Sequence, residues 1–114
     1  MMDCIFCKIA NGTIKTEILY EDEKVVAFRD INPVAPVHVL IVPKKHIESA
    51  LKLEGEDFNL IGHVFMVAKK LANELGIAED GFRIVNNCNR AGGQTVMHIH
   101  FHLLGGRDMQ WPPG

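Results

Sequence analysis

The chain has 114 residues, of which 47% are hydrophobic and 23% are charged, and its net charge at pH 7 is −2. This length and balance predict one folded domain over residues 1–114 with a hydrophobic core. The small negative charge argues against binding to nucleic acid or to an anionic membrane surface. No apolar run approaches the ~20 residues of a membrane span, and no secretory signal opens the sequence. With an odd number of cysteines, we therefore expect a cytoplasmic protein with reduced thiols.

Cys4 and Cys7 lie in the first predicted element, one or two helical turns that end at Asn11-Gly12. A Cys-x₂-Cys pair alone is a weak signal. It is compatible with half of a zinc site, with a redox pair, or with two small buried hydrophobic side chains.

Three strands and one long helix are expected next. Residues 18–20 and 25–28 read as two strands joined by a polar turn, and residues 37–42 as an almost continuously apolar strand at the centre of a sheet. Residues 55–75 change to helical periodicity, with Gly76 as the C-terminal cap and His63 at the surface. The apolar stripe of this helix consists of Phe58, Ile61, Val64, Phe65, Ala68, Leu71, Ala72 and Leu75.

A further strand at 82–86, a glycine-containing loop at 87–94 and a last strand at 98–104 complete the pattern. The predicted fold is α+β, with a five-stranded, mainly antiparallel sheet, one long helix and a short N-terminal helix.

Histidine and apolar residues alternate through the last strand, which contains His98, His100 and His102. On a strand, this period of two places all three imidazoles on one face and sends Met97, with the other apolar residues, into the core. A metal could take two rings, but His98 and His102 are separated by roughly 13 Å of strand, too far for one zinc ion. Nucleophilic catalysis is the other possibility, and the middle ring is then the natural attacking group.

Two loop motifs could complete such a site. Residues 92–95, Gly-Gly-Gln-Thr, offer backbone N–H groups, an amide and a hydroxyl for phosphate oxygens, or they form a glycine hinge between strands. Asp30, at the end of a strand, could accept the hydroxyls of a ribose, or it could cap its own loop in an Asx turn.

Taken together, these motifs resemble the histidine triad (HIT) family of nucleotidyl hydrolases and transferases. The resemblance covers nearly the whole chain and includes residues 4–9, 30–33, 42–46, 92–95 and 98–104. Residues 104–114, Leu-Gly-Gly-Arg-Asp-Met-Gln-Trp-Pro-Pro-Gly, look like the nucleoside phosphoramidase (Hint-like) branch in particular.

The resemblance implies an enzyme that cleaves the P–N bond of purine nucleoside 5′-phosphoramidates without a catalytic metal. His100 would attack the α-phosphorus, His102 would hold a phosphate oxygen, His38 would support the triad, and water would release the monophosphate. Thr95 stands where this branch commonly has serine, near the leaving amine. The nucleotide-binding positions carried over from the family are Phe6, Ile9, Phe28, Asp30, Ile31, Leu40, Asn87, Gly93, Gln94 and Thr95.

Zinc is expected as a structural ion, because Cys4, Cys7, His46 and His98 form a complete Cys₂His₂ set that looks similar in bacterial relatives. That use would make His98, the first member of the catalytic triad, an anchor for its strand. The alternative is that these four side chains simply lie in the core. A homodimer is also expected, formed through the outer face of the helix at 55–75.

Three alternative functions stay open. One is a dinucleoside polyphosphate hydrolase, one is a nucleotide-binding regulator with incidental hydrolysis, and one is a His-x-His metalloenzyme. A uridylyltransferase is disfavoured, because those transferases carry glutamine at the position of His102.

Overall fold

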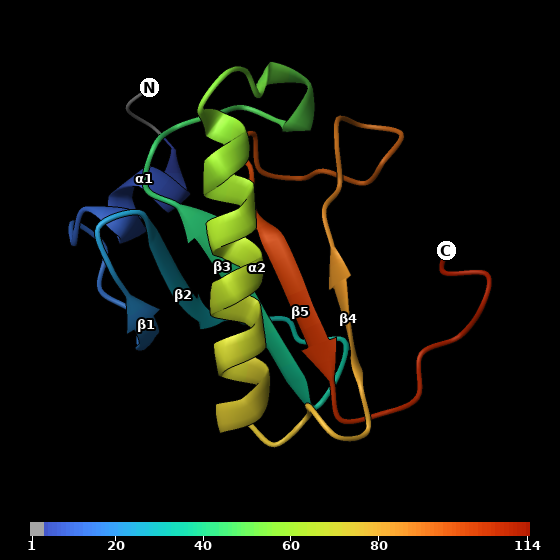
Figure 1. The fold of residues 1–114 in the computed structure, drawn as a ribbon. Coiled ribbons are helices and arrows are strands. Elements are labelled where there is room, and N and C mark those ends of the chain that lie inside the picture. Colours follow the sequence, from blue (N-terminus) through green and yellow to red (C-terminus); the bar gives the residue numbers. More distant parts are fainter. Residues whose placement is uncertain (1–3) are drawn as a thin grey trace.

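One antiparallel sheet, in the strand order β1-β2-β3-β5-β4, forms the centre of the computed structural model, which describes residues 4–114 (Figure 1). The predicted α+β fold is confirmed. In chain order the elements are α1 (Ile5–Ala10), β1 (Ile18–Glu21), β2 (Val25–Arg29), β3 (Val37–Pro43), the 3₁₀ helix η1 (Ala50–Lys52), α2 (Asp57–Glu74), β4 (Phe82–Val85) and β5 (Phe101–Gly105).

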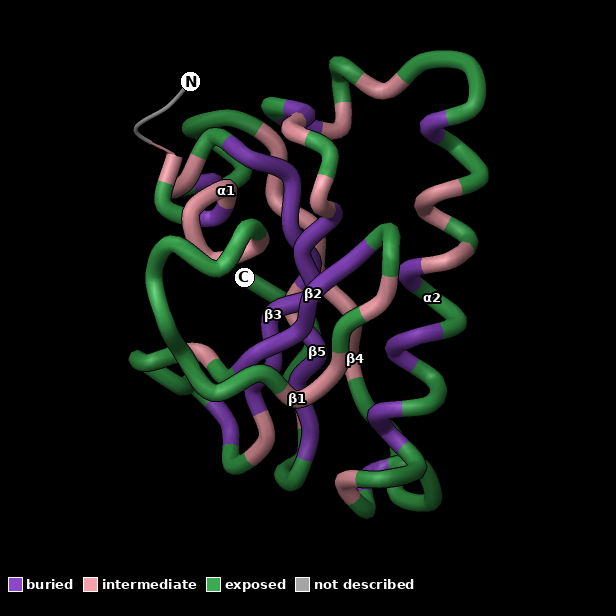
Figure 2. Tube along the Cα trace, turned by 90° about the vertical axis from the view of Figure 1, so that its left-hand side faces the viewer, coloured by how far each residue is buried: buried purple, intermediate pink, exposed green. Residues whose placement is uncertain are grey.

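β3 lies in the middle of this sheet and is buried on both faces, as its apolar sequence predicts. Val39 and Ile41 belong to the core on the side of α2, whereas Leu40 and Val42 pack in a second cluster with Phe6 of α1. The two helices therefore cover opposite faces of the sheet, as the turned view in Figure 2 shows. The site described below lies on the α1 face.

The long helix begins at Asp57 and ends at Glu74, and Gly76 follows with a positive φ of 76°. The predicted C-terminal cap is confirmed, and the Ile77 N–H returns to the carbonyl of Ala72. The face on the sheet differs from the predicted stripe, because it lacks Phe58 and Phe65 and includes Val67. Val64, Val67, Ala68, Leu71 and Ala72 are buried, but Phe58, Phe65 and Met66 are 60%, 50% and 60% exposed. One sheet covers only one side of a helix, so these three side chains face away from it.

The last strand starts three residues later than the sequence predicts, at Phe101. Its pairing with β3 extends only to Ile41, and Pro43, without an N–H, cannot continue the ladder on that side. The residues before Phe101 are held by other contacts, including a hydrogen bond from the Ile99 N–H to the Ile47 carbonyl at 2.6 Å. The regular alternation is therefore lost at its start. Met97, which we expected in the core, is 47% exposed.

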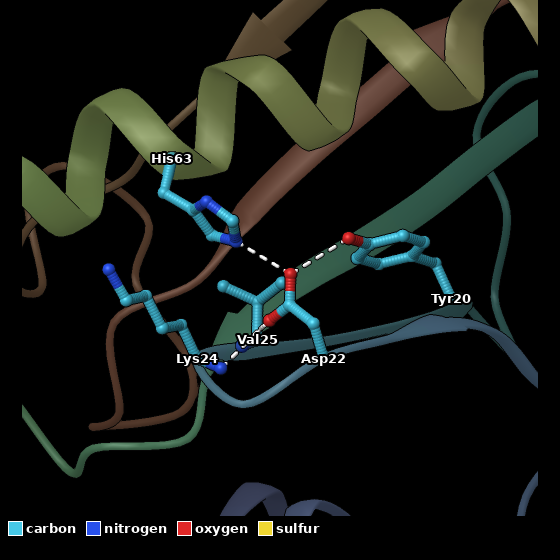
Figure 3. Close-up of polar contacts among 5 residues, drawn as sticks. All are labelled: Tyr20, Asp22, Lys24, Val25 and His63. Carbon is cyan, nitrogen blue, oxygen red and sulfur yellow. Dashed lines mark hydrogen bonds and ion pairs between the residues drawn. The ribbon is translucent and has the colours of Figure 1, made fainter.

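His63 is not the free surface residue that the sequence predicts. Its Nε2 lies 2.6 Å from Oδ2 of Asp22, and the same oxygen accepts a hydrogen bond from the Tyr20 hydroxyl (Figure 3). The other oxygen of Asp22 accepts the N–H groups of Lys24 and Val25 in the β1–β2 turn. Burial opposes ionisation of this carboxyl, but the four hydrogen bonds outweigh it and hold the pKa of Asp22 well below its usual range. This contact ties α2 to the edge of the sheet.

Within residues 4–114, no helix combines the length and the apolar character that crossing a membrane requires.

Candidate active site

A cavity of about 410 Å³ opens on the α1 face of the sheet. Residues from five separate parts of the chain meet there: α1, the segment after it, the end of β2 with the following loop, β3, and β5 with the segment that leads into it. Nine of the residues predicted from the sequence line it. They are Phe6, Ile9, Phe28, Asp30, Ile31, Leu40, Thr95, His100 and His102.

Strand register explains why these side chains meet. Phe28 of β2 is paired with Leu40 of β3, and Leu40 is paired with His102 of β5. Residues paired in this way point to the same face, so the three side chains form a row across neighbouring strands. Strands lie about 4.8 Å apart, so the row spans roughly 10 Å. The apolar floor is at one end of this row, and the histidines are at the other.

His100 is held in one tautomer by its own backbone. Its Nδ1 lies 2.8 Å from the carbonyl oxygen of His98, which can only accept, so Nδ1 carries the proton. Nε2 is then left with a free lone pair. The His100 carbonyl is fixed in turn by the side-chain amide of Asn86 at 2.9 Å. The ring is 5% exposed and packs edge-on against Phe6, so its position is well defined.

His102 is held in the opposite tautomer through His38. Nδ1 of His38 accepts the Val34 N–H at 3.1 Å, so the ring proton of His38 is on Nε2. That nitrogen lies 2.9 Å from Nδ1 of His102 and donates to it. The proton of neutral His102 is therefore on Nε2, which is available as a hydrogen-bond donor.

Both rings of this pair are neutral near pH 7. Burial lowers the pKa of His38, although the Asp30 carboxylate works in the opposite direction. Burial also lowers the pKa of His102, with smaller contributions from His100 and His38, to about 4. His100 with a lone pair and His102 with a donor are complementary: one can attack an electrophile, and the other can bind the oxygen that becomes more negative.

Asp30 forms the Asx turn, one of the two alternatives that the sequence left open, and it also lines the cavity. Its Oδ1 accepts the Asn32 N–H at 2.8 Å, which is the Asx turn. Its Oδ2 lies 3.3 Å from Nε2 of His38, and the carboxyl group, 19% exposed, lines the cavity. The carboxylate thus keeps acceptor capacity for a ligand.

Three predicted nucleotide contacts are not among the residues that line the cavity: Asn87, Gly93 and Gln94. The Gln94 amide is buried and bound to backbone groups of the protein, since it donates to the carbonyls of Glu48 and Val96 and accepts the Asn89 N–H. Gly93 has a φ of 90°, and a Cβ on Gly92 would lie 2.5 Å from the carbonyl oxygen of Cys88. These residues shape the loop that presents Thr95.

Sequence reasoning missed Asn86, which lies outside the cavity lining, and six residues that line the cavity. Asn86 carried no motif, and its contact with the His100 carbonyl is visible only in three dimensions. The others belong to α1, to the segment after it, to β2 and to the approach to β5. They are Ile5, Ile14, Lys15, Thr16, Arg29 and Val96.

Next to the cavity, Cys4, Cys7, His46 and His98 converge as the sequence predicts, with one donor atom from each within 4.8 Å of the others. Nδ1 of His98 lies 3.2 and 3.5 Å from the two sulfurs and 3.1 Å from Nδ1 of His46, and Cys7 Sγ lies 3.3 Å from His46. Tetrahedral zinc, with bonds of about 2.1 Å to nitrogen and 2.3 Å to sulfur, holds its donors roughly 3.3–3.8 Å apart. Nε2 of His98 lies 2.7 Å from the Pro43 carbonyl, which leaves Nδ1 unprotonated and directed at the cluster. The donor set therefore fits zinc.

The comparisons with known proteins agree with one another, because the similar proteins below are all described as HIT or histidine triad proteins. The model of the HIT domain matches residues 11–109. A crystal structure described as a HIT family hydrolase from Legionella pneumophila is 52% identical, with a TM-score of 0.96 over 98% of this chain and 100% of that one. A HIT-like protein of Synechococcus elongatus is 48% identical over 98% of this chain and 97% of its own length. A more distant structure, a histidine triad nucleotide-binding protein from Candida albicans, is 34% identical, with a TM-score of 0.82 over 96% and 83% of the two chains.

Proposed function

This chain belongs to the HIT domain family, and on that premise we propose that it is a nucleotide hydrolase that cleaves purine nucleoside 5′-phosphoramidates at the α-phosphate. The hydrolase description of the Legionella structure and the nucleotide-binding description of the Candida structure support this class of activity. The phosphoramidate itself rests on the resemblance of residues 104–114 to the phosphoramidase branch.

One observation carries the proposal: His100 and His102 line the same cavity in opposite tautomers. A free lone pair at His100 Nε2 is what attack on phosphorus requires. A donor at His102 Nε2 is what stabilises the negative charge that grows on a non-bridging oxygen. In these tautomers, neither neutral ring has to move its proton to the other ring nitrogen before the reaction starts.

The proposed reaction has two steps. In the first, the lone pair of His100 Nε2 forms a bond to the α-phosphorus while the P–N bond breaks, and the leaving nitrogen takes a proton delivered through the Thr95 hydroxyl. In the second, water attacks phosphorus and gives one proton to the Thr95 relay, which replaces the proton taken by the leaving nitrogen. The bond to His100 breaks, its electron pair returns to Nε2, and the nucleoside monophosphate is released. The His98 carbonyl keeps its hydrogen bond to Nδ1 throughout and stabilises the positive charge on the modified ring.

The remaining cavity residues would hold the nucleoside. Phe6, Ile9, Phe28, Ile31 and Leu40 offer apolar surface for a flat base, and the Asp30 carboxylate offers acceptors for the ribose hydroxyls. Apolar contact grips a ring without reading all of its edges, so discrimination among bases through these residues is expected to be weak.

We also propose that the Cys₂His₂ cluster binds one structural zinc ion per chain. When bound, the ion would supply only structural cross-linking: it would join α1, which carries Phe6 and Ile9, to the segment that carries His98. All four protein donors would be used, which leaves no open position for a substrate.

Steady-state hydrolysis tests the proposed activity. Adenosine 5′-phosphoramidate should be cleaved to AMP with a kcat/KM at least about tenfold above that for a dinucleoside polyphosphate. His100→Ala should reduce cleavage by at least about 10³-fold, since loss of a nucleophile can cost up to about 10⁶-fold. Preferred cleavage of the dinucleoside polyphosphate would transfer the proposal to that alternative. AMP binding without turnover of either substrate would instead favour a regulatory protein.

A further inference from the structure

His38 has one ring proton and two acceptors near it. Nε2 donates to Nδ1 of His102 at 2.9 Å, and Oδ2 of Asp30 lies 3.3 Å from the same nitrogen. Nδ1 of His38 is already used, because it accepts the Val34 N–H. The imidazole is 5% exposed, so no change of rotamer into solvent relieves this competition.

The second acceptor, the Asp30 carboxylate, also faces the cavity where a ligand would bind. Oδ1 of Asp30 is bound to the Asn32 N–H, so Oδ2 is the oxygen with the greater free capacity, and Asp30 lines the cavity. Hydrogen bonds donated by a ligand to this carboxylate would reduce its attraction for the His38 proton. That proton would then bind more strongly to His102.

We propose that His38 couples ribose recognition at Asp30 to the hydrogen bond that positions His102, so that the sugar hydroxyls of a ribonucleotide accelerate the chemical step as well as binding. This inference rests on the proposed hydrolase function for its kinetic consequence. His38 is a positioning residue here, because it reaches phosphate only through His102.

The coupling favours the transition state over the ground state. A firm bond from His38 keeps the proton of His102 on Nε2, where it stabilises charge that is larger in the transition state. When the carboxylate remains free to attract Nε2–H of His38, that bond is weaker, and His102 populates the other tautomer more readily. In that tautomer a lone pair faces the phosphate oxygen and repels it.

Two substitutions at His38 separate its role as a hydrogen-bond donor to His102 from its role in coupling Asp30 to His102. His38→Gln supplies an amide with two N–H groups, so that Asp30 and His102 can each receive one without competing. His38→Leu supplies none. The loss of the acceptor for the Val34 N–H is common to both variants, and Val34 is 59% exposed, so water can replace that bond.

Single-turnover rates with matched substrates test the kinetic claim. For wild-type protein, removing the 2′-hydroxyl from an adenosine phosphoramidate should lower the rate about five- to tenfold, the lower range of typical coupling between sites. His38→Gln should turn over faster than His38→Leu and show less than about a twofold difference between the two substrates. His38→Leu should be slow with both. An equal deoxy penalty in wild type and His38→Gln would overturn the coupling.

Nitrogen NMR of the histidine rings tests the same claim without turnover. Adding AMP to wild-type protein should move the ¹⁵N resonance of His102 Nδ1 toward a stronger hydrogen bond, and 2′-deoxy-AMP should move it by less than half as much. Equal shifts would overturn the coupling. If wild-type protein cleaves neither phosphoramidate, the proposed function fails, and the NMR comparison still decides whether His38 carries the signal.

Discussion

The carbonyl oxygen of His98 lies 2.8 Å from Nδ1 of His100, so the residue that anchors the segment also sets the tautomer of the proposed nucleophile. The ring of His98 is fully buried and belongs to the cluster with Cys4, Cys7 and His46. One residue would therefore serve the proposed zinc site through its side chain and the proposed reaction through its backbone. A change in the cluster that displaces His98 should therefore also alter the hydrogen bond between the His98 carbonyl and His100.

Zinc content and stability should fall together when the cluster is broken. Cys7→Ser should lose the roughly one zinc ion per chain expected of wild type and lower the melting temperature by about 5 °C or more, since 1 kcal/mol corresponds to about 4 °C in a domain of this size. Elemental analysis and thermal unfolding measure these quantities. Cys88→Ser is the matched control, because Cys88 is a free cysteine outside the cluster and should keep both values. Metal-free wild-type protein that melts at the same temperature as the zinc-loaded protein would contradict the proposal.

Stability should decrease as the pH falls from about 6.5 to about 4. Burial holds the pKa of His102 at about 4, below its ordinary value, whereas the unfolded chain regains that ordinary value. Between these values the unfolded state binds more protons, so acid favours unfolding in this window. Asp22, whose pKa is also lowered, contributes only near and below the ordinary aspartate pKa.

Urea unfolding at pH 7 and pH 5 measures this dependence. His102→Gln, which cannot ionise, should show a smaller loss of stability than wild type over the same interval. If His102→Gln loses as much stability as wild type between pH 7 and pH 5, other groups, including His38 and His98, account for the whole pH dependence.

A homodimer is expected through the exposed side of α2. Phe58, Phe65 and Met66 are at least half exposed there, and β4, at one edge of the sheet, leaves its outer hydrogen-bonding groups free of partners within the described strands. Apolar side chains and an open edge are features of protein interfaces. Phe65→Glu should therefore give monomers in sedimentation experiments at micromolar concentration. Leu51→Glu, at an exposed leucine in η1, should remain dimeric. A monomeric wild-type protein would contradict the interface.

The sequence predicts the elements well where one periodicity dominates. The central position of β3 and the extent of α2 follow from apolar patterns that packing on the sheet reinforces. The start of β5 does not follow from its own apolar pattern, because it depends on the missing N–H of Pro43 in a neighbouring strand. The exposure of Phe65 could not be predicted either, since a pattern gives the width of the apolar stripe but not the width of the surface that covers it.

The candidate site divides in a similar way. The motifs predict that the histidines, Asp30 and the apolar side chains belong to the site, because residue type and spacing carry their chemistry. The role of Gln94 is different from the expected one because its partners are backbone carbonyls of Glu48 and Val96, which no residue type encodes. Lys15 and Thr16 were missed because they belong to an irregular segment whose place in the cavity wall depends on the path of the chain after α1.

Mass spectrometry after rapid acid quench tests the central claim most directly. Wild-type protein mixed with adenosine 5′-phosphoramidate should gain one adenylyl group, and peptide mapping under mild conditions should place it on His100. His102→Ala should form the same adduct more slowly, because His102 stabilises charge but does not attack, and His100→Ala should form none. An adduct on His98 or His102, or normal turnover without any adduct on the millisecond scale, would contradict attack by His100.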